Sequence, residues 1–120
     1  MVLVNSSIWV DHFRRGNAGL ILKLEQGEAL IHPWILGELA TGQLRQRAKI
    51  LTYLKCLPSL TEVPLLRLLS FVEEFQLYSK GLGLVDCQLL ASAIESKSSL
   101  MTLDKGLAKA AASLGVLEKE

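Results

Sequence analysis

The stretch MVLVNSS, residues 1–7, is a continuous apolar run that stops abruptly at three small polar side chains. A run that is apolar on both faces is typical of a strand in the middle of a parallel sheet with helices on either side. The polar stop then lies at the carboxyl end of the strand, where open α/β sheets bind their ligands. Asn5 stands at the most favourable place for a ligand contact, and its side chain is neutral.

The rest of the chain alternates between strand-like and helix-like patterns. Ser6 or Ser7 is expected to cap the first helix. Further short strands are predicted at residues 28–32, 60–63, 99–103 and 116–117. Helices are predicted at residues 8–15, 17–26, 33–41, 44–57, 64–80, 84–96 and 104–115. Because strands and helices alternate without a repeat or a linker, the sequence predicts one α/β domain over residues 1–120, with a parallel sheet between helices.

Composition narrows the classes of function. Half of the 120 residues are hydrophobic, 21% are charged and the net charge is +1, which excludes a disordered chain and a general attraction to polyanions. Cys56 and Cys87 lie in apolar segments and are expected to be buried free thiols. The N-terminus has no basic leader, and no segment approaches the roughly 20 apolar residues of a membrane span. We therefore expect a soluble, cytoplasmic protein.

Three of the twelve acidic residues stand beside apolar neighbours, where an isolated carboxylate is costly. Glu38 is expected on a helix that is buried on most sides, and an ion pair with a distant Arg or Lys is the alternative to a ligand role. Asp104 begins a predicted helix, and Asp86 lies in the first turn of another. An ordinary helix-start role is the alternative for Asp86, and an N-cap role is the alternative for Asp104.

Together these acids indicate a metal site. In a parallel sheet the strand ends and the helices that follow them point to one side, so the three carboxylates are expected to converge. Converging carboxylates repel one another unless a cation neutralises them. Hard oxygen ligands favour Mg²⁺ or Mn²⁺, which can activate water and hold a phosphate oxygen. The sequence has no nucleophile elbow, Walker loop or zinc-ligand spacing that would support a competing chemistry.

Four segments that span nearly the whole chain carry a family resemblance: VNSSIWVD (4–11), ILGELA (35–40), GLVDCQLLA (83–91) and MTLDK (101–105). The chain resembles the PIN-domain ribonucleases and, within them, the VapC-type toxins of bacterial toxin–antitoxin pairs. The resemblance implies a three-layer α/β/α sandwich with a central parallel sheet. It also implies a Mg²⁺- or Mn²⁺-dependent endoribonuclease that cleaves structured RNA, often tRNA or rRNA, by metal-activated water.

The resemblance also assigns residues to the site. It implies that Glu38, Asp86 and Asp104 hold the metal and orient the attacking water. Thr102 fits the family's hydroxyl that supports the metal or the phosphate, and Ser6 or Ser7 could serve in the same way beside the first strand.

Asn5 departs from the family pattern, which has an aspartate, usually the central metal ligand, at this position. Asparagine keeps one carbonyl oxygen but loses the negative charge and gains an NH₂ donor. We expect Asn5 to be a weak metal ligand and the chain to cleave RNA slowly or not at all. An engineered change and a naturally attenuated protein both explain it, and the other intact motifs favour the first. The alternative function is a non-catalytic PIN-like module that binds RNA or an antitoxin without cleavage.

The resemblance implies partners as well. The family pairs with a small VapB-type antitoxin that covers the active site, and homodimers are usual. The candidates for an antitoxin groove, with plain core packing as the alternative, are Trp9, Phe13 and Trp34. The candidates for RNA phosphate contacts, with a solvated surface as the alternative, are Arg45, Arg47, Lys49 and Lys105.

Overall fold

The computed structural model describes residues 1–119, and its sheet has three short parallel strands. Strand β1 (Val2–Val4) lies between β2 (Ala29–Leu30) and β3 (Ser99–Met101). Leu3 pairs with Leu30 on one side and with Leu100 on the other. Every residue of β1 is buried, so the apolar run at the start of the sequence is the central strand, as predicted.

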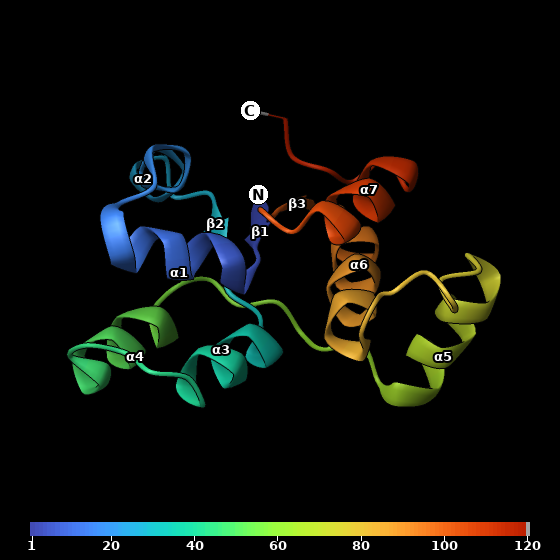
Figure 1. The fold of residues 1–120 in the computed structure, drawn as a ribbon, viewed down its shortest axis with the longest axis horizontal. Coiled ribbons are helices and arrows are strands. Elements are labelled where there is room, and N and C mark those ends of the chain that lie inside the picture. The colour runs from blue at the N-terminus through green and yellow to red at the C-terminus, as the bar shows by residue number, and fades with distance from the viewer. Residues whose placement is uncertain (120) are drawn as a thin grey trace.

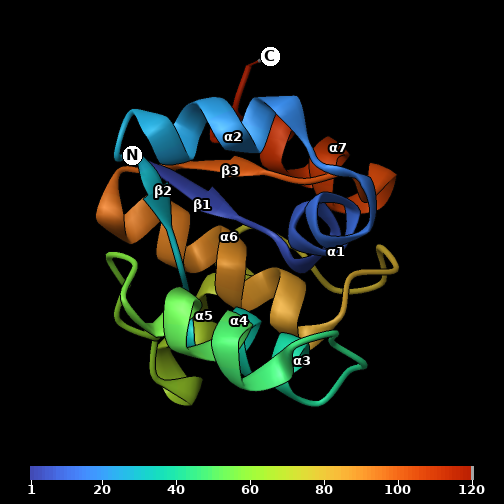
Figure 2. The ribbon, with the colours of Figure 1, turned by 90° about the vertical axis from the view of Figure 1, so that its left-hand side faces the viewer.

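Helices cover both faces of this sheet. Figure 2 shows α2 and α7 on one face and α6 on the other, with α3, α4 and α5 on the α6 side. Helix α5 packs against α6 and projects at one edge of the molecule (Figure 1). The arrangement is the predicted three-layer α/β/α sandwich. The helices are α1 (Ser6–Arg15), α2 (Ala18–Glu25), α3 (Pro33–Ala40), α4 (Arg47–Lys55), α5 (Leu65–Glu74), α6 (Leu84–Ser96) and α7 (Lys105–Ser113).

Each strand is followed by a polar residue that caps the next helix of the sandwich. Asn5 follows β1 and caps α1, His32 follows β2 and caps α3, and Asp104 follows β3 and caps α7. The prediction that Ser6 or Ser7 caps α1 is wrong, because both residues are already helical. Because the strands are parallel, all three caps lie at the same edge of the sheet.

Two predicted helices are shorter than expected. The helix predicted at 44–57 is α4, which begins only at Arg47 because Gln46 has a left-handed backbone with φ 53°. The helix predicted at 64–80 is α5, which ends at Glu74 and is followed by the left-handed Gln76, with φ 52°. Residues with positive φ interrupt a right-handed helix.

Three smaller predictions also need correction. The strand predicted at 60–63 is absent from the described chain, and a single bridge joins Ile31 to Ser59 instead. The edge strand predicted at 116–117 is likewise one bridge, between Leu100 and Leu117. Cys87 is buried, but Cys56 is exposed at the end of α4. None of the helices within residues 1–119 is long and apolar enough to cross a membrane.

Candidate active site

Asn5 is the centre of a hydrogen-bond cluster at the carboxyl edge of the sheet. Its Oδ1 accepts hydrogen bonds from Ser7 N at 3.1 Å, Ser7 Oγ at 2.6 Å and Thr102 Oγ1 at 3.1 Å. The backbone N–H of Leu103 donates to Ser7 Oγ, and that of Asp104 donates to Thr102 Oγ1, both at 3.0 Å. Because each hydroxyl oxygen accepts an N–H, its own hydrogen is free to point at Asn5.

The cluster fixes the orientation of the Asn5 amide. A backbone N–H can only donate, so the side-chain atom that faces Ser7 N must be the oxygen. The NH₂ group therefore points away from the cluster, and it has no protein acceptor within residues 1–119. Three donors surround this one neutral oxygen. Such an environment would stabilise a carboxylate more than an amide, because hydrogen bonds to a charged acceptor are stronger.

Glu38 is exposed in the last turn of α3, contrary to the prediction that its helix is buried on most sides. Ile35 and Leu39 face the core, whereas Gly37 and Glu38 face solvent. The carboxylate of Glu38 makes no hydrogen bond or ion pair with any other residue of the described chain. The ion pair considered as the alternative for Glu38 is therefore not found there.

Asp86 and Asp104 take the structural roles that were considered as alternatives to metal binding. Asp86 Oδ2 accepts the backbone N–H of Gly83 at 3.0 Å and so caps the start of α6. Asp104 Oδ1 accepts the backbone N–H of Leu107 at 3.0 Å at the start of α7. Each cap uses one carboxylate oxygen, which leaves the other oxygen for a ligand.

As they stand, the described side chains do not fit a Mg²⁺ or Mn²⁺ ion. No group of three or more His, Cys, Asp or Glu side chains between residues 1 and 119 is close enough to hold one metal ion. Three donors already occupy the Asn5 oxygen. Its amide nitrogen has no lone pair for a cation. The site thus brings together Asn5, Ser7 and Thr102, but it does not bring together the three acids.

Comparison with known proteins places the chain in a family. The profile described as PIN domain matches residues 2–113. The chain belongs to the PIN-domain family. Two relatives described as "Ribonuclease VapC32", from two strains of Mycobacterium tuberculosis, are each 40% identical to it over 120 residues, which is 97% of this chain and 94% of theirs. The predicted family, with its VapC group, is thereby confirmed.

The fold of this PIN domain is also similar to a solved structure. The crystal structure of PAE2754 from Pyrobaculum aerophilum matches with a TM-score of 0.66 and 17% sequence identity, over 91% of this chain and 83% of that one. At this identity the likeness concerns the fold alone. It agrees with the α/β/α sandwich described above.

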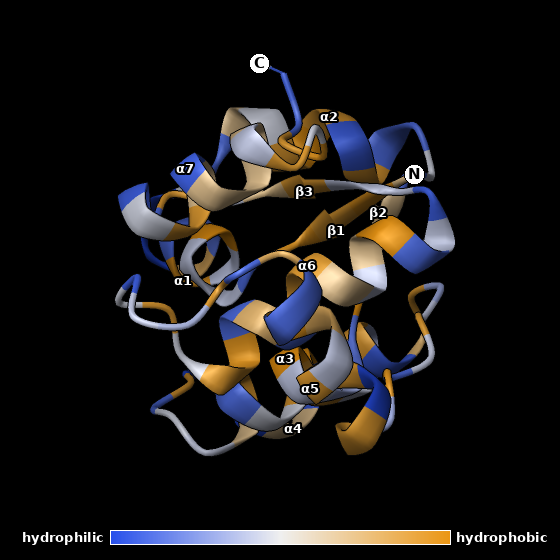
Figure 3. Ribbon diagram, turned by 90° about the vertical axis from the view of Figure 1, so that its right-hand side faces the viewer, coloured by the Kyte–Doolittle hydropathy of each residue, from blue (hydrophilic) through white to orange (hydrophobic). Residues whose placement is uncertain are grey.

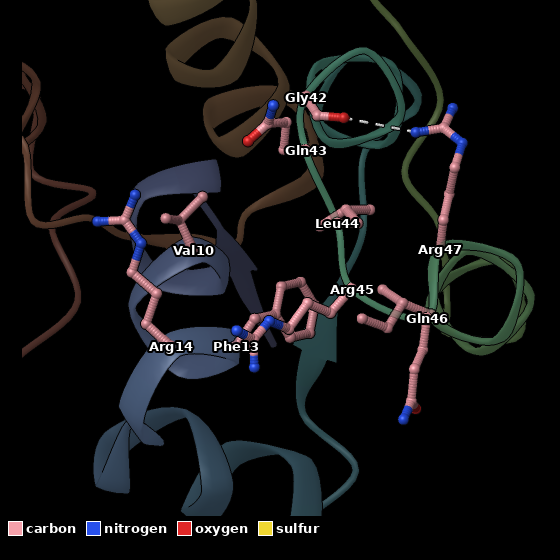
Figure 4. A pocket seen from close by; sticks show the side chains of 10 residues that line it. Val10, Phe13, Arg14, Gly42, Gln43, Leu44, Arg45, Gln46 and Arg47 are labelled. Carbon is pink, nitrogen blue, oxygen red and sulfur yellow. Dashed lines mark hydrogen bonds between the residues drawn. The ribbon is translucent and has the colours of Figure 1, made fainter.

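A cavity of about 940 Å³ lies between α1 of the PIN domain and the segment that leads into α4 (Figure 4). Phe13, Leu44 and Ile50 are among its apolar lining residues. Its positive lining residues are Arg14, Arg45 and Arg47. The lining segment begins at Gly42, one helical turn after Glu38, so the cavity adjoins the end of α3.

This cavity includes some of the predicted surface residues and not others. Phe13, Arg45 and Arg47 line it, whereas Lys49 and Lys105 are exposed outside its lining. Arg14 also lines this cavity, one turn along α1 from Val10.

The two tryptophans differ from each other. Trp9 is 0% exposed and stacks on Phe13 with ring centroids 5.8 Å apart. It is a core residue, so it offers no surface to the groove for which it was a candidate. Trp34 is half-buried and donates its indole N–H to Glu62 Oε2 at 2.6 Å. Of the two, Trp34 alone has surface for a partner.

Proposed function

We propose that this chain is a VapC-type endoribonuclease toxin, a single PIN domain over residues 1–120 that acts in the cytoplasm, and that Asn5 impairs its nuclease site. The impairment rests on one observation: the three donors on Asn5 Oδ1 leave its NH₂ group, rather than an oxygen, facing out of the cluster. Membership of the PIN family supports hydrolysis of RNA. The proposed substrate is structured RNA, such as tRNA or rRNA.

The role of position 5 follows from the shape of the cluster. In an Asn5→Asp variant one carboxylate oxygen would accept the three hydrogen bonds, and the second would replace the NH₂ group. We propose that this second oxygen, Glu38 and the unused oxygens of Asp86 and Asp104 would hold Mg²⁺ or Mn²⁺ once the ion draws the carboxylates together, because the three acids do not form such a group in the described structure. Thr102 would keep the position-5 side chain in its orientation. When bound, the metal would supply an activated water for attack on the RNA phosphate.

The test is a cleavage assay on total RNA with the chain as given and with Asn5→Asp, each with and without Mg²⁺. We expect Asn5→Asp to raise the Mg²⁺-dependent rate by at least about a hundredfold, the order of effect of one well-placed electrostatic contact in a transition state. Asn17→Asp is the matched control, because Asn17 caps α2 in the way that Asn5 caps α1. Equal rates for the chain and Asn5→Asp would contradict the ligand assignment.

The same orientation of Asn5 supports a second candidate function, a PIN-like module that binds RNA or an antitoxin without cleaving RNA. An NH₂ group at the site can donate to an anion but cannot hold a cation. Under this alternative, Asn5→Asp stays inactive and Mg²⁺ leaves the melting temperature of both proteins unchanged. Under the first proposal, Mg²⁺ raises the melting temperature of Asn5→Asp only, because ligand binding stabilises the folded state.

We also propose that the cavity beside α1 is part of the RNA path. Three guanidinium groups can bind phosphates while an apolar surface accepts an unpaired base. Lys49 and Lys105 would extend the contacts. Removing one phosphate contact should lower the salt dependence of RNA affinity by about one ion, so Arg45→Ala is compared with Arg67→Ala, whose guanidinium instead pairs with Glu95. Equal salt dependence for the two variants would exclude this path.

A VapB-type antitoxin is the proposed protein partner, and we propose that it binds beside the cavity next to α1. The accessible aromatic candidates for its contact are Phe13 and Trp34, both half-buried. A pull-down of the chain with a co-expressed antitoxin tests this contact. If the antitoxin covers the cavity, Phe13→Glu should weaken its capture more than tenfold. Tyr78→Glu, at an exposed aromatic outside the cavity, is the control.

A homodimer is the third proposed assembly, and α5 offers a surface for it. Leu65, Leu66 and Leu69 lie along α5 and are 55%, 79% and 46% exposed. Figure 3 shows α5 on the side of the molecule that faces the viewer, with apolar residues along its ribbon. A second copy of the chain would cover the same leucines symmetrically. We expect sedimentation equilibrium to show a dimer that Leu66→Lys converts to a monomer, whereas an unchanged mass would place the interface elsewhere.

A further inference from the structure

A buried histidine connects two of the helices that carry candidate acids. His32 is 0% exposed, and its Nδ1 accepts the backbone N–H of Trp34 at 3.0 Å, the first hydrogen bond of α3. Its Nε2 lies 2.9 Å from Ser92 Oγ, in the middle of α6. Because Nδ1 accepts, the ring proton belongs on Nε2, which donates to the serine.

The hydrogen bonds continue from Ser92 to a third segment. Ser92 Oγ donates to Gln88 Oε1 at 2.9 Å. The Gln88 amide then pairs with both backbone polar groups of Val63, accepting its N–H at 2.7 Å and donating to its carbonyl at 3.0 Å. Each buried side-chain nitrogen and oxygen in this network has at least one hydrogen-bond partner. The network joins the start of α3, the middle of α6 and the segment before α5.

The location of the network relates it to the proposed site. Helix α3 carries Glu38 in its last turn, and α6 carries Asp86 in its first. We propose that His32 is a positioning residue: its hydrogen bond to Ser92 sets the placement of α3 against α6, and thereby the placement of Glu38 relative to Asp86. This inference rests on the function proposed above for the two acids.

The geometry also makes the link sensitive to protonation. A second ring proton would belong on Nδ1, where it would face the N–H of Trp34, and two donors cannot bond to each other. From α6 the ring faces the uncharged Gln88 and Ser92, and the charged group nearby is Glu62, which precedes α5 and holds the Trp34 indole. Burial lowers the pKa of His32, which agrees with a neutral ring.

The first test asks whether the link exists in the chain as given. Imidazole ¹⁵N shifts should show His32 with its proton on Nε2, and the opposite tautomer would overturn the proposal. Ser92→Ala should speed hydrogen exchange at the Trp34 amide about fivefold, the size of a weakened N-cap. Ser96→Ala is the matched control, because Ser96 lies one turn further along α6 and bonds to Ser92 O and to Ser98. Equal exchange in both variants would contradict the link.

The second test asks whether the link positions α3. Residual dipolar couplings report the orientation of α3 relative to α6 and need no nuclease activity. The orientation should change in Ser92→Ala and stay unchanged in Ser96→Ala, and an unchanged orientation in both would overturn the positioning role. This result stands whether or not the proposed function fails.

The third test links positioning to cleavage in the Asn5→Asp background. Ser92→Ala should lower kcat about tenfold with KM altered less than about twofold, because misplaced groups lose transition-state contacts rather than substrate binding. The fall of kcat at acid pH should follow the NMR titration of His32 and disappear in His32→Asn, which keeps a cap acceptor but not the link. Unchanged kcat in Ser92→Ala would limit the network to a structural role and reject our inference.

Discussion

Asn5 and His32 hold equivalent places, since each follows a parallel strand and caps the next helix with its side chain. Around His32 the donors and acceptors are matched: one ring nitrogen accepts, the other donates, and Ser92 and Gln88 pass the bonds on to Val63. Around Asn5 they are not matched, because three donors meet one oxygen while the NH₂ group has no acceptor in the described chain.

The difference distinguishes polar groups that hold the fold together from polar groups that are available to a ligand. A matched network in the interior holds segments together and leaves nothing for a ligand. In the unmatched cluster at the end of β1, one side-chain group of residue 5 has no partner in the described chain, and we propose that its identity, NH₂ or oxygen, decides whether the site binds an anion or a cation. The variants below test this contrast, beginning with the largest expected effect.

Replacing Gln88 with leucine should cost the most stability. The Val63 N–H and C=O and the Ser92 hydroxyl would lose their partners in the interior. Unsatisfied buried groups of this kind make the expected loss about 3 kcal/mol in the free energy of unfolding, measured by urea denaturation. Gln26→Leu, on the exposed end of α2, should change it by less than about 0.5 kcal/mol. Similar losses in both variants would show that the matched network adds no stability.

Acid pH should lower the free energy of unfolding through His32. The folded state lowers the pKa of His32 from its ordinary 6.5 through burial. Below that pH the unfolded chain therefore binds more protons than the folded one, and the free energy of unfolding falls as the pH falls. The slope attributable to this group approaches about 1.4 kcal/mol per pH unit at most. Denaturation between pH 7 and 5 should show this slope in the chain and not in His32→Asn.

Thr102→Val, in the cluster around Asn5, should cause a moderate loss of stability. The valine keeps the shape but removes a donor to Asn5 Oδ1 and the acceptor for the Asp104 N–H. Since Asn5 keeps two other donors and the Asp104 region is exposed, we expect a loss of about 1 kcal/mol by thermal denaturation. Thr102→Ser restores the hydroxyl and should recover most of it. No recovery would indicate that the methyl group matters rather than the hydrogen bonds.

Glu38→Gln should have the smallest effect on stability. The side chain is exposed and has no partner in the described chain, so the free energy of unfolding should change by less than about 0.5 kcal/mol. In the Asn5→Asp background the same substitution should strongly reduce Mg²⁺-dependent cleavage. A large stability change would reveal a structural contact of Glu38, and unchanged cleavage would remove it from the proposed ligands.

Sequence patterns predicted the central strand and the family because both can be recognised from short stretches of consecutive residues. The run at residues 1–7 is apolar on both faces, and such a strand can be buried only between two layers. The α4 boundary was missed because Gln46 adopts a left-handed conformation that its side chain does not signal.

The acids were harder to place, because their arrangement depends on details of caps and exposure. Asp86 and Asp104 each use one oxygen for a helix start, and α3 exposes Glu38 although its sequence is almost entirely apolar. The His32 network was missed because its partners lie up to 60 positions apart in the chain.

The three capping residues have one more consequence, which concerns the electric field. They place the N-termini of α1, α3 and α7 at one edge of the sheet, and each helix adds about half a positive charge there. The formal net charge omits this contribution. The Asp104 carboxylate offsets the share of α7, whereas the neutral Asn5 does not offset the share of α1 as an aspartate would. We therefore expect the chain to hold RNA more tightly than Asn5→Asp in EDTA, as a filter-binding comparison can show. The asparagine that we propose to weaken cleavage would then also lengthen the time for which an uncut RNA stays bound.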